Sequence, residues 1–566
     1  MKKQLLFFYS AFIFFASLKN IYAQTGTIPT GSDTTCSNGI SFYQKSYGGL
    51  NNDIGYYLTL SSDSGYVISG ETNSFGNGAK DGIVMKVNAR GNTVWSKAIG
   101  GGSGDILLMV RQTSDNGFIA CGQTKSYGNA AGDAWLVKLD ASGNVQWSKK
   151  YGDGNVNGEH AFDVIQLSDG GYAFCGAHRF APGVSESFVV RTDNQGNVLW
   201  SKQYGNFSSD NAYGLEEDGN FLLVVGIYYG QSFYDSYVMK LDKSNGAVQW
   251  IKGYDAENRS TWFSKIRKTN TGYQVFGVIT DNFLDQNQQQ CIWNLNTDGT
   301  VQNVRKLVIP GIYTASVGWL ARPDGGFVAM GGENNNSSDI LFSQVNANGS
   351  LAWSKKYVRS GRQMITHIVA SPYGGYAGVG INNNAGTIPD SNNVYLMRVD
   401  SLGDAGICSG INTNDVTIVS PSYTTPNSDV AALGDMTINN PVITVGVMNF
   451  APAIRTLCFY CQPKPTGSLR LLEGGTGSHI ITLYSNPTRN SLINLIIDAE
   501  FNDMAEISVI DWHLGNFVFK SSVKPIYKGK NQMQFNLNGK LSRNRFYVVK
   551  IRFKDYEQSL KIFSID

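Results

Sequence analysis

The sequence predicts an all-β protein, and three observations lead to this prediction. Glycine contributes 64 of 566 residues, aromatic residues 12 % and charged residues only 16 %, so the chain is richer in glycine and poorer in charge than an average globular protein. A segment of about fifty residues recurs along two thirds of the chain. Short alternating stretches separated by turn-forming residues fill the repeats and the C-terminal region. Glycine has no triplet period, which excludes collagen, and the low charge disfavours coiled coils.

The first residues have the features of a secretory signal peptide. Lys2 and Lys3 precede an apolar run over 5–18, and Ala23 supplies the small residue that a signal peptidase requires. The run reaches only ~21 Å as a helix, short of a ~30 Å hydrocarbon core, so a retained membrane anchor is the less favoured alternative. We therefore expect residues 1–23 to be removed, leaving an N-terminal segment over 24–40.

The charge of the mature chain argues against a nucleic-acid partner. Cleavage removes three lysines and no acid, which changes the formal charge from +2 to −1. A near-neutral chain has no electrostatic basis for binding phosphate backbones. No later apolar stretch approaches ~18 residues, so no transmembrane anchor is expected.

Two signatures define the repeat. The first contains a tryptophan, as in 139–152 (LDASGNVQWSKKYG), and the second is a glycine-aromatic segment such as 114–122 (SDNGFIACG). The second signature occurs seven times, and the tryptophan slots of the seven repeats are spaced by 50 to 53 residues. These slots hold Phe42, Trp95, Trp147, Trp200, Trp250, Asn303 and Trp353.

Each repeat is predicted to contain four short antiparallel strands. In the second repeat these strands and their two tight turns fall at 107–112, 115–117 (turn), 118–122, 134–139, 140–143 (turn) and 144–149. Gly117 is expected to supply the positive φ of the first turn. Four strands at a fifty-residue period are typical of a propeller blade, and a β-solenoid, whose coils are usually shorter, is the alternative.

The two ends of the repeat array complement each other. The seventh repeat lacks its own fourth strand, whereas 41–48 is a fourth strand that precedes the first repeat. We expect 41–48 to pair with 394–399 and close the ring, which would leave no open sheet edge. The prediction is a seven-bladed β-propeller over 41–406.

The repeat resembles the tryptophan-bearing tandem propeller repeats of secreted bacterial proteins. Its Asp140, Gly143 and Trp147 also resemble the repeat of quinoprotein dehydrogenases, but nothing outside the repeat matches the calcium ligands and quinone pocket of those enzymes. The tryptophan and the Asp-Gly turn are therefore interpreted as blade packing.

A separate module is predicted after the Pro/Gly linker at 462–468. From Ile480 onward the chain contains about seven alternating strands, enough for a small immunoglobulin-like β-sandwich over 467–566. The stretch 407–466, which includes the linker, is β-rich, and it either packs on the propeller or forms a separate stalk.

The motifs of this last module resemble the C-terminal sorting domain of the type IX (Por) secretion system of Bacteroidetes. Ser485 replaces the first proline of that family's Y-P-N-P motif, and Asn544-Arg545 replaces the glycine before its F-Y strand. The matching motifs follow the family's order and include Tyr484, Asn486, Pro487, Asp511, Leu514, Gly515, 528–537, Tyr547 and Lys561.

This resemblance implies a cellular location and partners. It implies passage across the outer membrane by the type IX secretion machinery, a cell-surface or extracellular location, and attachment of the passenger to surface lipopolysaccharide. The alternative is an adhesive β-sandwich at the end of the chain that has no role in secretion.

The seven cysteines fall into two groups. Cys121 and Cys175 occupy an inward position of a buried strand, and Cys291 is solitary. The remaining four, Cys36, Cys408, Cys458 and Cys461, permit three disulfide pairings. A Cys36–Cys408 bridge would lock the ring where it closes and would leave Cys458–Cys461 as the second pair, whereas a redox or zinc role for this C-x-x-C is less favoured.

No motif for catalysis, metal or cofactor binding is found. None of the five histidines has a partner at metal-ligand spacing, and neither a nucleophile elbow, an H-E-x-x-H sequence nor a P-loop occurs. No catalytic residue, metal or cofactor is therefore assigned. The repeated acids at positions such as Asp115 and Asp169 are interpreted as turn formers.

Candidate ligand residues lie where the loops break the repeat. Their rings would suit stacking on a sugar or a peptide, or would instead pack between blades. These candidates are Glu159, His160, His178, Tyr228, Phe233, Trp262 and Trp319. A non-enzymatic module that binds a glycan, peptide or protein is the favoured function. The alternatives are a polysaccharide hydrolase or lyase, which needs converging acids over the channel, and a spacer without a ligand.

Overall fold

The computed structural model describes residues 39–404 apart from short loop segments, and beyond 404 it describes mainly strands. The loop segments outside the description are 155–156, 182, 207, 230–233, 281–288, 309–317, 323, 333–338, 358–361 and 384–390. The predicted signal peptide and Cys36 precede the described residues.

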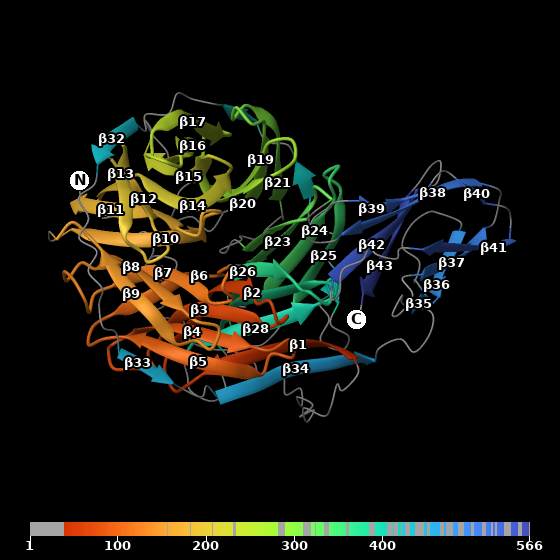
Figure 1. Cartoon of the computed structure of the whole chain (residues 1–566), viewed down its shortest axis with the longest axis horizontal. Coiled ribbons are helices and arrows are strands. Elements are labelled where there is room, and N and C mark those ends of the chain that lie inside the picture. Colours follow the sequence, from red (N-terminus) through yellow and green to blue (C-terminus); the bar gives the residue numbers. More distant parts are fainter. Residues whose placement is uncertain are drawn as a thin grey trace, which may run out of the picture.

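Seven antiparallel sheets form the blades of a β-propeller, as predicted (Figure 1). Blades 1 to 6 each contribute four consecutive strands from the inside of the ring outward, and blade 7 contributes three. In blade order the strands are β2 (Asp53–Leu60), β3 (Tyr66–Thr72), β4 (Asp81–Val87), β5 (Thr93–Gly100); β6 (Asp105–Gln112), β7 (Phe118–Thr124), β8 (Asp133–Leu139), β9 (Val145–Tyr151); β10 (Gly158–Gln166), β11 (Tyr172–Ala181), β12 (Val184–Thr192), β13 (Val198–Gly205); β14 (Asn211–Asp218), β15 (Phe221–Tyr229), β16 (Tyr234–Asp242), β17 (Val248–Ala256); β18 (Ser260–Lys268), β19 (Tyr273–Thr280), β20 (Gln289–Leu295), β21 (Val301–Val308); β22 (Gly318–Ala321), β23 (Phe327–Gly332), β24 (Ile340–Val345), β25 (Leu351–Tyr357); and β26 (Arg362–Ala370), β27 (Tyr376–Asn383), β28 (Asn393–Val399).

The ring closes through the N-terminal strand. β1 (Gly39–Gly48) pairs antiparallel with β28, with Tyr43 opposite Arg398 and Tyr47 opposite Val394. The predicted closing pair is confirmed, and blade 7 therefore contains strands from both ends of the propeller.

The first turn of blade 2 differs from its prediction in one detail. In blade 2 the positive φ belongs to Asn116 (63°), not to Gly117. Gly117 is required for space, because a Cβ there would lie 2.3 Å from the carbonyl oxygen of Leu139. The second turn behaves as predicted, with φ of 79° at Gly143.

The hydrophobic core lies between the blades. Seven buried clusters each combine side chains from two neighbouring blades, one cluster for each junction of the ring. In the cluster between blades 4 and 5, for example, Val225 packs with Phe263 and Trp293. Each blade therefore needs both neighbours to bury its faces.

A tyrosine, in most cases with the repeated tryptophan, clamps a blade to the next at five junctions of the ring. Tyr151, at the end of β9, donates a hydrogen bond of 2.8 Å to the carbonyl of Gly196, in the second turn of blade 3. A Cβ at Gly196 would lie 2.9 Å from the ring of Trp147, and φ at this glycine is +75°. The same tyrosine-to-glycine bond recurs at Tyr47, Tyr204, Tyr254 and Tyr357. The packing interpretation of the tryptophan and its glycine turn is confirmed.

The chain after blade 7 runs back around the outside of the ring. Successive strands pair with the outermost strands of blades 6, 5, 4, 3, 1 and 7, so these sheets have a fifth strand. Of the two alternatives for 407–466, the packed one is found for the strands of this region. They are β29 (Ile411–Asn412), β30 (Thr417–Val419), β31 (Tyr423–Thr424), β32 (Ala431–Asp435), β33 (Gly446–Asn449) and β34 (Ala453–Pro463). We call these six strands the outer belt.

Two further sheets follow the outer belt. One has the order β35-β36-β37-β41, and the other has the order β39-β38-β42-β43 with β40 paired to β38. Their strands are β35 (Leu469–Arg470), β36 (His479–Tyr484), β37 (Leu492–Ala499), β38 (Asp503–Asp511), β39 (Phe517–Lys520), β40 (Lys524–Ile526), β41 (Gly529–Asn536), β42 (Arg545–Arg552) and β43 (Glu557–Ser564). Within the described part of the chain, no helix is long and apolar enough to cross a membrane.

Adding a methyl group at the clamp should destabilise the ring. We expect Gly196→Ala to cost about 2–4 kcal/mol, because alanine disfavours positive φ and its Cβ meets Trp147. The matched control is Gly170→Ala, where φ is +88° but nothing lies within 4 Å, and there only the backbone cost of about 1 kcal/mol applies. Urea unfolding followed by tryptophan fluorescence measures both. If Gly196→Ala and Gly170→Ala lower the free energy of unfolding equally, the contact with Trp147 contributes nothing.

Candidate functional site

One face of the propeller carries the long connections of every blade. Each connection between the second and third strands, and each passage from one blade to the next, leaves from the same ends of the strands, whereas the tight hairpins lie at the other ends. An acid stands near the start of the innermost strand in the first four blades, at Asp53, Asp105, Glu159 and Asp210. These acids form a repeated row on the long-loop face.

In most of this row the acid is held by structural hydrogen bonds. Asp105 faces Thr124 across the sheet and accepts bonds of 2.6 Å from the hydroxyls of Thr124 and Ser126, and one of 2.8 Å from the N–H of Gly101. Asp53 accepts the equivalent bonds in blade 1. These carboxylates serve to anchor the entry loop.

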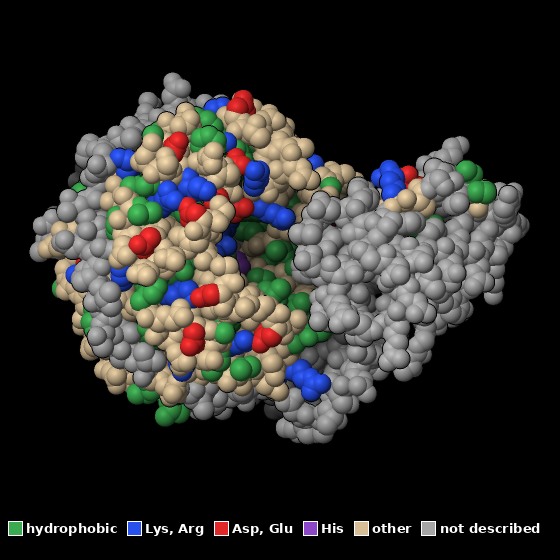
Figure 2. Space-filling view, viewed as in Figure 1, with side chains coloured by type: hydrophobic (Ala, Val, Ile, Leu, Met, Phe, Trp, Pro, Cys, Tyr) green, Lys and Arg blue, Asp and Glu red, His purple; other side chains and the backbone are tan. Residues whose placement is uncertain are grey.

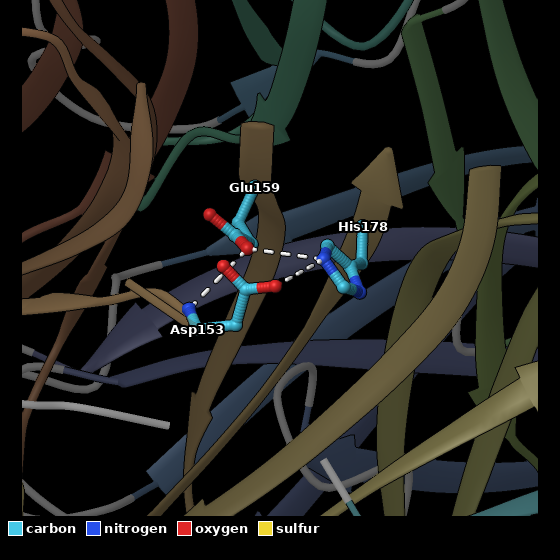
Figure 3. A group of neighbouring side chains, drawn as sticks. All are labelled: Asp153, Glu159 and His178. Atoms are coloured by element: carbon cyan, nitrogen blue, oxygen red, sulfur yellow. Dashed lines mark hydrogen bonds and ion pairs between the residues drawn. The ribbon is translucent and has the colours of Figure 1, made fainter. Parts of the chain in front are cut away.

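Blade 3 departs from this pattern at three positions. Glu159 replaces the aspartate, and His178 and Phe180 stand where blades 1 and 2 have threonine and serine, so both hydroxyl donors of those two blades are missing. Glu159 lies directly opposite His178, and Asp153 from the preceding loop joins them (Figure 3). His178 Nε2 lies 3.2 Å from Asp153 Oδ2 and 3.3 Å from Glu159 Oε1. We call these three residues the blade-3 cluster.

Burial dominates the electrostatics of the blade-3 cluster. The side chains of Glu159 and His178 are 0 % and 3 % exposed. Burial, together with the neighbouring Asp153 and Asp133, raises the pKa of Glu159 to about 8. Burial also lowers the pKa of His178, although Asp153 acts against this shift. The cluster thus holds two carboxyl groups and one imidazole in a site with little water, an arrangement that suits a small cation or a shared proton.

His160 does not join the cluster. The sequence singles out Glu159 and His160 as one cluster, but successive residues of a strand point to opposite faces of the sheet. His160 Nε2 instead lies 2.8 Å from the amide of Gln123 in blade 2. The true partner of Glu159 is His178, which is also a sequence candidate, and Asp153 is the member that the sequence did not single out.

The predicted aromatic candidates are mostly covered. Tyr228 and Trp319 are 1 % and 6 % exposed and lie in the cores between blades, where no ligand can stack on them. Trp262 is half-buried against Tyr213, with 4.9 Å between ring centroids. Phe233 lies outside the described residues.

Two other rings are exposed on the long-loop face. Phe180 and Tyr229 are 38 % and 42 % exposed, the largest values for aromatic side chains in the described part of the chain. They end the second strands of neighbouring blades, β11 and β15. Strand alternation explains the difference from the prediction, because Tyr228 points inward where Tyr229 points outward.

A second polar cluster fills the channel. Asp163 Oδ1 and Oδ2 lie 3.1 Å from Arg111 Nη2 and Lys265 Nζ, respectively, and Lys265 also lies over the ring of Tyr57. Tyr57 stacks on His367 at 3.6 Å between centroids. These residues belong to the innermost strands of blades 1, 2, 3, 5 and 7, so they meet across the centre of the ring. Figure 2 shows the propeller hollowed near its centre, with Lys and Arg side chains at the rim of the hollow.

The channel cluster is an ion-paired brace. Burial alone would raise the pKa of Asp163, but Lys265 and Arg111 outweigh it and hold this pKa below its usual range. Leu215 N–H adds a bond of 3.1 Å to the same carboxylate. The Asp163 carboxylate pairs with two cations from two other blades, so the brace links three blades. No sequence pattern predicted this brace.

The structure describes some of the cysteines and some of the C-terminal motif residues. Cys121, Cys175 and Cys291 are free and buried, as small core residues. Cys458 and Cys461 both lie on β34, opposite Gln44 and Ser41 of β1. Three residues of extended strand span about 10 Å, more than the ~7 Å that a disulfide permits between Cα atoms, so this strand is incompatible with a Cys458–Cys461 bridge.

Of the motif residues, Tyr484, Tyr547 and Lys561 lie in β36, β42 and β43. Asn486, Pro487 and Gly515, together with Cys36 and Cys408, lie outside the described residues.

Comparison with known proteins finds no family and only distant structural similarity. No protein-family model matches the chain, and no curated protein matches it. Similar solved structures include a 6-phosphogluconolactonase candidate from Bacteroides uniformis, with 10 % identity, a TM-score of 0.38, and coverage of 68 % of this chain and 100 % of that one. A protein of unknown function from Dyadobacter fermentans covers 63 % and 97 % at 10 % identity and a TM-score of 0.37.

A quinohemoprotein alcohol dehydrogenase from Comamonas testosteroni covers 65 % of this chain and 78 % of its own, at 10 % identity and a TM-score of 0.32. The class that the structure defines is a seven-bladed β-propeller, and these values carry no information on its ligand.

Removing the anion of the channel brace should destabilise the propeller. We expect Asp163→Asn to cost about 2–3 kcal/mol at neutral pH, because Arg111 and Lys265 would face each other unpaired, with partial screening by water. The contribution of a carboxylate with a lowered pKa is fully present above its unfolded pKa of about 4 and is lost as the pH falls through the lower folded value.

The stability difference between the wild type and Asp163→Asn should therefore shrink below about pH 4 in urea unfolding experiments. Asp169→Asn, at an exposed hairpin of the same blade, is the control and should cost less than about 1 kcal/mol. A difference that persists unchanged at acid pH would rule out the ion-pair explanation.

Proposed function

We propose that this protein is an exported binding module whose propeller takes its ligand on the long-loop face of blades 3 and 4. The observation that carries the proposal is the exposure of Phe180, whose ring centroid lies 4.2 Å from that of His178, and of Tyr229 on the neighbouring blade. Exposed rings beside polar groups are the usual means of holding a sugar or a peptide. The ligand class is accordingly a glycan or a peptide.

The enzyme alternative has one observation in its favour. Asp153, Glu159 and His178 converge, as a polysaccharide hydrolase or lyase would require. However, Glu159 and His178 are almost completely buried, so a polymer cannot reach the atoms that would have to transfer protons. Burial therefore favours binding over catalysis.

We further propose that the two C-terminal sheets form an immunoglobulin-like sorting domain. The ordered motifs of 480–566 support this assignment, since they resemble the type IX sorting domain over its whole length. The domain would carry the propeller across the outer membrane through the type IX secretion machinery and lead to attachment to surface lipopolysaccharide.

Truncating the exposed rings should weaken ligand binding. The probe is the labelled full chain on glycan and peptide arrays, followed by titration of the strongest hit. Phe180→Ala and Tyr229→Ala should each weaken binding about 5- to 30-fold, equivalent to about 1–2 kcal/mol. Leu199→Ala is the matched control, because Leu199 is 57 % exposed on β13 of the same blade. Unchanged affinity in both ring variants would contradict the proposed surface.

Deleting residues 480–566 should stop export. Fractionation of the producing cells should find the truncated propeller in the periplasm, because the signal peptide still directs it across the inner membrane. Protease resistance of the retained propeller serves as the control for folding. Export of the truncated chain at the level of the full chain would contradict the sorting assignment.

A further inference from the structure

The blade-3 cluster contains polar atoms that the protein itself does not satisfy. Glu159 Oε2 is buried and has no hydrogen-bond partner, and buried His178 Nε2 makes no well-directed hydrogen bond although oxygens of Asp153 and Glu159 lie within 3.3 Å of it. Asp153 and Glu159 oxygens lie near Nε2, and one ligand atom from each of the three residues can be chosen so that all lie within 4.8 Å of one another. Buried polar atoms without partners are costly, so a group that the three side chains share is required to stabilise them.

The distances in this cluster also fit ligand atoms around one metal ion. Metal bonds of 2.0–2.2 Å at tetrahedral angles place neighbouring ligand atoms about 3.3–3.6 Å apart. His178 Nε2 lies 3.2 and 3.3 Å from the oxygens of Asp153 and Glu159. The arrangement therefore has two edges close to those of a tetrahedron, and each residue presents an atom to the same point (Figure 3).

The surroundings orient the imidazole as metal sites require. His178 Nδ1 contacts the side-chain amide of Gln203 on β13. The structure places the Gln203 nitrogen at Nδ1. A half-turn of this amide would bring its oxygen there to accept an Nδ1–H bond, which would leave the Nε2 lone pair for a metal. Asp133, the next carboxylate, is already paired with Lys150 at 2.7 Å and is not a ligand.

A comparison with blade 2 shows which hydrogen bonds the acid of blade 3 lacks. At the equivalent position of blade 2, two hydroxyls and a backbone N–H satisfy Asp105. In blade 3 the two hydroxyl positions are His178 and Phe180, which cannot replace those bonds to Glu159. The exchange removes donors and adds one metal-ligating nitrogen.

We propose that Asp153, Glu159 and His178 bind one divalent transition-metal ion of the zinc class. Two carboxylates and one imidazole are ligands that Zn²⁺ accepts, and three protein ligands leave a fourth position open for water or a ligand. Ca²⁺ is disfavoured because it needs six to eight oxygens. This inference goes beyond the proposed function, since the exposed rings can hold a ligand with or without the metal.

Titration of the metal-free full chain with Zn²⁺ tests the site. The protein, without a polyhistidine tag, is treated with EDTA, dialysed and titrated calorimetrically. We expect one Zn²⁺ per chain and at least tenfold weaker binding in Glu159→Gln and in His178→Gln, each of which removes one ligand atom. Asp169→Asn, which changes an exposed acid of the same blade, is the control and should bind as the wild type does.

Two further measurements keep the test independent of variant folding. Zn²⁺ should raise the unfolding temperature of the wild type and of Asp169→Asn, but not that of Glu159→Gln. Pulsed EPR of the wild type loaded with Cu²⁺ should show a single coordinated imidazole. The proposal is overturned by Zn²⁺ affinity that is unchanged in both ligand variants, by a wild type that binds Ca²⁺ but not Zn²⁺, or by two coordinated imidazoles.

Discussion

The shared core between neighbouring blades is the constraint on which the rest of the structure depends. Each of the seven buried clusters draws on two blades, so a blade cannot bury its faces alone and the ring must close. Closure explains why β1 supplies the fourth strand of blade 7. It also explains the clamp in which Trp147 and Tyr151 of one blade meet Gly196 of the next. The outer belt then pairs the outermost strands of six blades, which protects edges that would otherwise be open to other chains.

The same constraint makes a departure from the repeat informative. Residues that recur between blades form turns, clamps and entry loops, as Asp53 with Thr72 and Asp105 with Thr124 do in blades 1 and 2. Blade 3 replaces this pair with Glu159 and His178 and loses the bonds that satisfy it. A loss of stabilising hydrogen bonds at one repeated position, with ligating atoms in their place, is expected where a site has been added to a structural scaffold.

The fold was largely predictable because its signals are local. The spacing of Trp95, Trp147 and Trp200, together with the glycine turns, predicts the blades and their number, and the unpaired strand at 41–48 predicts the closure. The sequence did not decide whether 407–466 packs on the propeller, because no local pattern indicates which strand edge a short alternating segment pairs with. The pairing at Cys458 and Cys461 was misjudged because an extended strand, not a turn, separates them.

The site was predictable only in part. Glu159 and His178 were found because they interrupt the repeat, but their contact and the role of Asp153 depend on a cross-strand register that the loop sequence conceals. Alignment of Glu159 with Asp105, and of His178 with Thr124, would have paired them. The channel brace of Arg111, Asp163 and Lys265 joins residues of three blades, and only the closed ring brings them together.

The most direct measurement of the central claim is anomalous diffraction at the zinc edge from crystals of the full chain grown with Zn²⁺. The account predicts one strong peak in the propeller, about 2.0–2.2 Å from side-chain atoms of Asp153, Glu159 and His178. Anomalous density that is absent from this point, with the three side chains hydrogen-bonded only to one another, would contradict it.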